Sequence, residues 1–267
     1  MTRRKAYLLA GPTAGGKTAA AAVLARETGA AVLSADSMLV YRGMDIGTAK
    51  PAPAEREGYV LGGIDLADPD EEFSAGAWLR AAAEFARSLP PDKPLIVAGG
   101  TGLYFSALLR GLDREWSDPP PPCPYLDVPR DELRRRAAAR IEAMFDAGWA
   151  REVAGLAAKF PAWSRTASCA IGYAEIRAGF SFPADGDPVP PPEPLFSQMK
   201  ERLLVRTMRL AKHQATWFRH QTSPIPVKAC GGDASATARA VAGAWRECGP
   251  ADIMLPGPGE FPERVRR

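Results

Sequence analysis

The chain carries a glycine-rich motif whose spacing is specific for phosphate binding. Residues 11–18 read GPTAGGKT and fit the pattern G-x-x-x-x-G-K-[ST]. In such a loop the glycines let successive N–H groups point inward, while the following helix and the lysine add positive charge. The motif predicts a polyphosphate site made by Gly11, Pro12, Thr13, Ala14, Gly15, Gly16, Lys17 and Thr18, with the Thr18 hydroxyl as a ligand for Mg²⁺. It does not tell whose phosphates are bound.

A carboxylate follows the next apolar run, at Asp36. If that run is a strand, Asp36 lies at its carboxyl end, on the same rim of the sheet as the phosphate loop. There it could take a proton from an acceptor nucleophile or support Mg²⁺. It could equally cap a helix, and its position alone does not separate these roles.

An α/β sheet is needed to bring these residues together. Short apolar runs predict buried strands at 7–10, 31–34, 61–65 and 95–98, and the segments between them predict helices at 17–27, 74–88 and 103–109. This alternation indicates a P-loop NTPase-like parallel sheet flanked by helices. Further helices are expected at 130–147, 195–220 and 234–245, with a short strand-like piece from Ser223.

The chain divides at changes in composition. We expect the first part of the P-loop core at 1–112 and a connector at 113–129. Because six prolines fall within residues 118–129, this connector is predicted to be stiff and extended and not a folded element. A reduced helical part at 130–222 completes the core, and a partly flexible extension with a frayed tail follows at 223–267.

The helix expected at 195–220 has an apolar and a basic face. Leu204, Met208, Ala211, Ala215 and Phe218 form the apolar stripe, and Arg202, Arg206, Arg209 and His213 lie opposite it, with Lys212 to one side. This basic face is either solvated or bound to an anion such as diphosphate or a nucleic-acid backbone. A second basic group, at Arg134, Arg135, Arg136 and Arg140, is interpreted mostly as surface.

Composition limits the remaining possibilities. The 267 residues carry a net charge of +3, which permits contact with nucleic acid without requiring it. Four scattered cysteines and two histidines make a structural zinc site improbable and fit a reducing compartment. The apolar runs are too short for a membrane span or a signal peptide, so we expect a cytoplasmic protein that does not contact membranes.

The sequence resembles the tRNA dimethylallyltransferases, also called tRNA isopentenyltransferases. The similar pieces are GPTAGGKT, SADSMLVYRGMDIGTAKP, GGIDLADPDEEFSAGAW, VAGGTGLYFSALLRGL, AIGYAEI and LAKHQATWF. The resemblance covers roughly residues 4–111 and, more loosely, 131–219. It implies a Mg²⁺-dependent, monomeric enzyme that transfers a dimethylallyl group from dimethylallyl diphosphate to N6 of the adenosine 3′ to the anticodon, in the anticodon stem-loop of tRNA.

The resemblance also implies roles for individual residues. Asp36 would accept the proton from the adenine amine, and Lys17 and Thr101 would complete the catalytic set. The phosphate loop and Arg209 would bind the diphosphate, and Thr18 the metal. The residues expected against the tRNA are Asp36, Ser37, Met38, Leu39, Thr101, Arg206 and Lys212.

Three departures from the family pattern keep alternatives open. The family usually has Gln, which helps to read the target adenine, where this chain has Leu39, and often Arg where it has Met208. A helical insertion that usually follows the position of Leu112 is replaced by the proline-rich connector. The absent insertion favours an adenylate dimethylallyltransferase, whereas the segments around Asp36 and Trp217 favour the tRNA enzyme. A small-molecule P-loop kinase and a non-catalytic RNA-binding relic are the other candidates.

Overall fold

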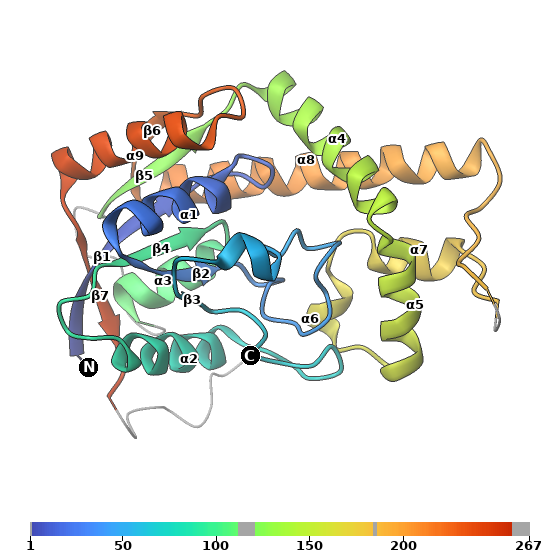
Figure 1. Cartoon of the computed structure of the whole chain (residues 1–267), viewed down its shortest axis with the longest axis horizontal. Coiled ribbons are helices and arrows are strands. Elements are labelled where there is room, and N and C mark those ends of the chain that lie inside the picture. Colours follow the sequence, from blue (N-terminus) through green and yellow to red (C-terminus); the bar gives the residue numbers. More distant parts are fainter. Residues whose placement is uncertain (1, 112–120, 184–185, 258–267) are drawn as a thin grey trace.

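The computed structural model describes residues 2–111, 121–183 and 186–257, and a central sheet organises them (Figure 1). Parallel strands lie in the order β3-β2-β4-β1-β5-β6, and β7 pairs antiparallel with β1. The strands are β1 (Thr2–Ala10), β2 (Ala31–Ala35), β3 (Leu61–Gly62), β4 (Leu95–Gly99), β5 (Pro122–Asp127), β6 (Ser223–Lys228) and β7 (Ala251–Leu255). The prediction of a parallel α/β sheet is confirmed.

Helices cover both faces of the sheet. They are α1 (Lys17–Thr28), a short 3₁₀ turn η1 (Pro53–Arg56), α2 (Ala75–Ser88), α3 (Gly102–Arg110), α4 (Arg130–Asp146), α5 (Trp149–Lys159), α6 (Arg165–Ser168), α7 (Tyr173–Gly179), α8 (Leu195–Gln221) and α9 (Ala234–Cys248). Alternate residues of the strands feed two apolar cores. Leu9, Val32 and Ile96 pack with α1 and α9, whereas Leu8, Leu33 and Val97 pack with α2, α3 and α8.

The predicted helices are confirmed within a few residues at their ends. Ser74 caps α2, its side chain accepting the N–H of Ala77, as expected from the sequence. Between α4 and α8 the chain adds α5, α6 and α7, which were not predicted. They lie beyond one edge of the sheet, on the right in Figure 1, next to the loop that follows β2.

The prediction that residues 113–129 form no folded element is wrong for Pro122–Asp127, which are strand β5. Residues 112–120 of that connector lie outside the described residues. β5 pairs with the edge strand β6. The amides of Ser223 in β6 and of Ala229 just after it donate to the carbonyls of Pro121 and Asp127. Odd-numbered residues of β6 therefore face β5, so its prolines fall at positions that need no N–H toward the sheet.

The expected frayed tail is also wrong in part. Residues 251–255 form β7 and pair with β1 from Thr2 to Ala6. The same pairing explains why β1 begins at Thr2, although its polar start suggested a strand only from Tyr7. Residues 258–267 lie outside the described residues. In the described part, no helix is both long and apolar enough to cross a membrane.

Candidate active site

The phosphate loop connects β1 to α1 and is shaped for an anion. Gly16 is the N-cap of α1 and has φ 95°, a left-handed conformation that favours glycine. Because this cap has no side chain, it leaves the first amides of α1 to a ligand. A Cβ on Gly15 would lie 2.8 Å from the Pro12 carbonyl oxygen, so the loop closes tightly. The Lys17 ammonium donates to that same oxygen at 2.8 Å.

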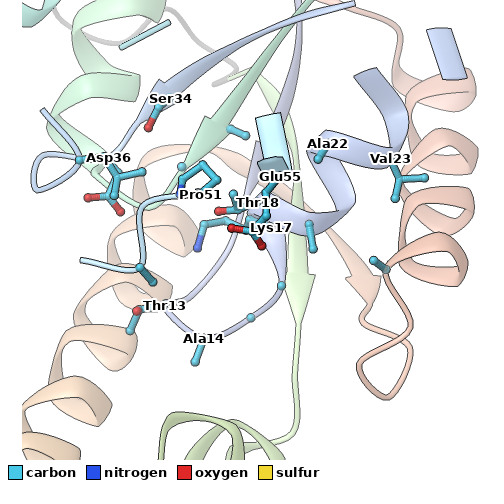
Figure 2. A pocket seen from close by; sticks show the side chains of 18 of the residues that line it. Thr13, Ala14, Lys17, Thr18, Ala22, Val23, Ser34, Asp36, Pro51 and Glu55 are labelled. Atoms are coloured by element: carbon cyan, nitrogen blue, oxygen red, sulfur yellow. The ribbon is translucent and has the colours of Figure 1, made fainter. Parts of the chain in front are cut away.

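A cavity of about 570 Å³, here called the P-loop cavity, opens above this loop. Thr13–Thr18 line one side of it, and Asp36 and Leu39 line another. Figure 2 shows the Lys17 side chain directed toward the side of the cavity where Thr13 and Asp36 lie. The loop residues predicted for phosphate binding are thus gathered around a single space, with the carboxylate of Asp36 at its border.

A second cavity, of about 540 Å³, adjoins the first. Thr13, Asp36, Thr48 and Arg140 line both cavities, so the two meet at these side chains. The second cavity is more apolar, and its walls come from the loops after β2 and β4 and from helices α4 and α8. Among its lining residues are Ser37, Met38, Thr101, Gln214 and Trp217.

Asp36 is held at the junction by the turn that follows β2. Its Oδ1 accepts the N–H of Met38 at 2.9 Å, so it caps this turn and no helix. Thr101, at the start of α3, fixes the next residue: its Oγ1 accepts the Ser37 N–H at 2.9 Å and donates to the Ser37 hydroxyl at 3.3 Å. The sheet places β2 beside β4 in register, which brings these two loops together.

The electrostatics of the P-loop cavity favour an anionic ligand. Burial lowers the pKa of the Lys17 ammonium from 10.5 to about 8, an effect that the Asp36 carboxylate opposes and the Arg140 guanidinium reinforces. Burial likewise lowers the pKa of Arg140, again opposed by Asp36. Two cations held in one desolvated space lose much of this penalty when an anion enters.

Arg140 and Arg136 correct the interpretation of the α4 arginines as surface. Arg140 Nη2 donates to Thr13 Oγ1 at 2.9 Å, and both arginines line the P-loop cavity. Arg140 Nε and Arg136 Nη2 are buried without a hydrogen-bond partner among the described residues. These unsatisfied donors point to a missing acceptor, such as a phosphate oxygen.

Of the basic residues expected on α8, His213 lines the second cavity, whereas the arginines and Lys212 line neither cavity. Arg206 forms an ion pair with Glu175 of α7. Arg209 and Lys212 are exposed, and neither lines the P-loop cavity or the second cavity. The apolar stripe is confirmed at Leu204, Ala211 and Phe218. It is wider than predicted, however, because Leu203 and Thr207 are also buried while Met208 and Ala215 stay half-exposed.

Sequence reasoning also missed Gln214 of α8. Its Oε1 accepts the N–H of Thr13 at 2.8 Å, and its side chain packs against Gly100, where a Cβ would lie 2.3 Å from Nε2. Together with Arg140 it holds Thr13 of the phosphate loop from two helices. One signal for Arg140 was present in the sequence: it adjoins the buried Ala137, Ile141 and Met144, which are spaced as one helix face.

Known proteins resemble this chain in sequence. The IPP transferase family model matches residues 39–125 and 121–221, and the isopentenyl transferase model matches residues 4–60. A tRNA dimethylallyltransferase of Chloroflexus aurantiacus is 30% identical over 79% of this chain and 91% of its own length. One from Desulfosudis oleivorans is 51% identical over 43% of this chain, which corresponds to 37% of that relative. The chain thus spans well under two thirds of the Desulfosudis protein.

Solved structures share the fold. A tRNA isopentenylpyrophosphate transferase from Staphylococcus epidermidis superposes with a TM-score of 0.73 at 22% identity, over 91% of this chain and 100% of that one. The full-length enzyme of Bacillus halodurans gives a TM-score of 0.72 at 24% identity, over 91% and 97%. Since the family model matches well over half of the residues and the Chloroflexus protein aligns over most of its own length, the chain belongs to the IPP transferase family.

Proposed function

We propose that this chain transfers a dimethylallyl group from dimethylallyl diphosphate to N6 of an adenosine in tRNA. The observation that carries the proposal is the meeting of two cavities at Asp36, one built for phosphates and one largely apolar. Such a pair of spaces suits a transferase, because it can hold a donor and an acceptor side by side with their reacting atoms in contact. The tRNA dimethylallyltransferases related to this chain support the choice of substrates.

The P-loop cavity is the donor site in this proposal. The diphosphate lies against the loop amides, with Lys17 and Arg140 as cationic partners. As the bond between the allylic C1 and the diphosphate oxygen breaks, negative charge grows on the leaving oxygens. Lys17 and Arg140 stabilise that charge. The released product is diphosphate.

The second cavity is the acceptor site. The target adenine leaves its stack to enter it, as bases do in other enzymes that modify them. The N6 lone pair attacks C1, the new N6–C1 bond forms, and the proton lost from N6 passes to Asp36. Thr101 and Ser37 position Asp36 through the turn that they fix. Trp217 lines this cavity and offers an aromatic ring to a base.

Mg²⁺ fits the donor site by its chemistry. The Thr18 hydroxyl lines the P-loop cavity and is an oxygen donor, which Mg²⁺ prefers. No group of three or more His, Cys, Asp or Glu side chains suited to a metal occurs among the described residues. The substrate diphosphate would therefore supply further ligands, as is usual for Mg²⁺. When bound, the ion would neutralise charge on the leaving group.

The adenylate dimethylallyltransferase suggested by the short connector is not favoured by the comparisons. The relatives of this chain are tRNA dimethylallyltransferases, and the IPP transferase model matches residues on both sides of the connector.

Ligand-induced stabilisation tests the donor assignment. With Mg²⁺ present, dimethylallyl diphosphate should raise the melting temperature of the protein more than ATP does at equal concentration, because the ligand with the lower Kd stabilises the folded protein more. Stabilisation by ATP alone would favour the small-molecule kinase. Transfer of label from dimethylallyl diphosphate to AMP but not to tRNA would favour the adenylate enzyme.

A further inference from the structure

Leu39 is a buried apolar side chain that belongs to neither hydrophobic core. It is 7% exposed, yet it is absent from both core clusters, whereas its neighbours Val40 and Tyr41 are part of one of them. Its backbone is fixed, because its carbonyl accepts the N–H of Asp65 at 3.1 Å. What Leu39 borders instead is the P-loop cavity.

Neighbouring residues of this loop serve different cavities. Met38 lines the second cavity and not the P-loop cavity, and Leu39 lines the P-loop cavity and not the second. The sequence resemblance suggested that both would face the tRNA. The geometry instead places Leu39 on the donor side of Asp36, only three residues from the carboxylate that receives the proton.

Away from the phosphate loop, the lining of the P-loop cavity includes apolar side chains as well as polar ones such as Arg26, Ser34 and Glu55. Ala49, Pro51 and Ala98 line the same cavity, and the Thr48 hydroxyl there already donates to the carbonyl of Met44. A prenyl diphosphate has an anionic end and a hydrocarbon end. With the anionic end on the phosphate loop and C1 near Asp36, its hydrocarbon needs an apolar surface beside that carboxylate.

We propose that Leu39 contacts the hydrocarbon of the prenyl donor and makes the cavity selective for an unsubstituted dimethylallyl chain over a hydroxylated one. This inference rests on the proposed function and assigns Leu39 to donor choice. An isobutyl side chain adds apolar contact but offers no hydrogen bond, so a donor hydroxyl placed against it would be desolvated without a partner. A glutamine at this position could pair with that hydroxyl.

Binding of two ligands tests the contact without any need for turnover. Calorimetry with Mg²⁺ compares inorganic diphosphate with dimethylallyl thiolodiphosphate, a slowly reacting analogue that keeps the hydrocarbon. Leu39→Ala should weaken binding of the analogue on the order of tenfold and leave the affinity for diphosphate unchanged, since only the hydrocarbon loses contact. Leu39→Met, which keeps the volume, should retain most of the affinity for the analogue.

Met38→Ala is the matched control, because Met38 is the adjacent side chain but faces the second cavity. It should change the affinity for neither ligand. Equal weakening of diphosphate and analogue by Leu39→Ala would overturn the proposal, because Leu39 would then support the phosphate loop and not the hydrocarbon. Unchanged binding of both ligands would overturn it as well.

Donor competition tests the selectivity. Leu39→Gln should lower the ratio of kcat/KM for dimethylallyl diphosphate to that for its 4-hydroxylated analogue about tenfold, the effect of one unpaired polar group. The KM for the adenosine acceptor should stay the same. If Leu39→Gln changes only the acceptor KM, Leu39 reads the acceptor base and the proposal is wrong. If the wild type binds the prenyl analogue no more tightly than inorganic diphosphate, the proposed function itself fails.

Discussion

At the scale of single residues, the site holds two cations, Lys17 and Arg140, partly away from water, which would solvate them better. Lys17 is enclosed by the loop that it belongs to, and its pKa falls to about 8 for that reason. Arg140 is half-buried beside it, and its buried Nε has no hydrogen-bond partner in the described part of the chain. Desolvation of these cations lowers the stability of the free protein, and an ion pair with a bound diphosphate offsets this loss.

The pKa of Lys17 predicts how donor binding depends on pH. Because its pKa in the free protein is about 8, Lys17 is charged below that pH and loses its proton above it. A bound diphosphate favours the charged form, so affinity should begin to fall as the pH approaches 8 and should continue to fall above it. Calorimetric titration of dimethylallyl thiolodiphosphate between pH 7 and 10 measures this.

Lys17→Met provides the control for this pH profile. It should bind the analogue more weakly than wild type and show no decline between pH 8 and 10. A wild-type affinity that stays flat up to pH 10, or a variant with the same decline as wild type, would show that Lys17 does not titrate in contact with the diphosphate.

Asp36→Asn separates proton transfer from donor binding. Asparagine keeps the shape of Asp36, and its Oδ1 can still accept the Met38 N–H, but it cannot take a proton from N6. We expect kcat to fall by roughly two powers of ten or more while the affinity for diphosphate changes little. Loss of diphosphate or Mg²⁺ binding in this variant would instead identify Asp36 as a support for the metal.

At the scale of elements, two helices that are distant in sequence hold the phosphate loop in place. Thr13 receives a hydrogen bond from Arg140 of α4 and gives its N–H to Gln214 of α8. Both helices also line the second cavity. The acceptor side of the site is thereby attached directly to the phosphate loop.

Arg140→Ala tests this attachment. Removal of a charge-assisted donor to the loop and ligand should weaken diphosphate binding about tenfold to a hundredfold. Arg135→Ala is the matched control, because Arg135 lies on the same helix but is exposed and pairs with Glu132. It should bind diphosphate like the wild type, as measured by calorimetry. Equal affinities in the two variants would remove Arg140 from the donor site.

The elements also show which features the sequence could predict. The phosphate loop and Asp36 were found because short local runs define them, each directly after an apolar strand. Arg140 and Gln214 were missed because their contacts with Thr13 join residues 127 and 201 positions apart. β5 was missed because prolines usually exclude strands, and because its partner β6 lies about a hundred residues further along the chain.

At the scale of the whole molecule, the proposed function requires an exposed surface that binds the tRNA backbone. Arg202, Arg209 and Lys212 are exposed on α8, the helix whose Gln214 and Trp217 line the acceptor cavity. Arg206 is already paired with Glu175, which leaves its three neighbours to contact phosphates. Such contacts are independent of sequence and weaken with salt.

The tRNA affinity of the double variant Arg209→Ala/Lys212→Ala should therefore depend less steeply on salt concentration than that of the wild type. Each lost phosphate contact lowers the slope of log affinity against log salt by about 0.7 to 0.9. Filter binding across salt concentrations measures this slope. Arg239→Ala/Arg246→Ala removes two exposed charges from α9, which packs on the opposite face of the sheet, and should leave the slope unchanged. Similar slopes in both double variants would mean that another surface binds tRNA.

The central claim is that Asp36 joins a donor and an acceptor cavity for prenyl transfer to tRNA adenosine. The most direct measurement is mass spectrometry of nucleosides from tRNA that was incubated with the protein, dimethylallyl diphosphate and Mg²⁺. We predict an adenosine heavier by one dimethylallyl group in place of one hydrogen, formed by the wild type and nearly lost in Asp36→Asn. Unmodified tRNA after incubation with folded wild-type protein that binds the donor would contradict the claim.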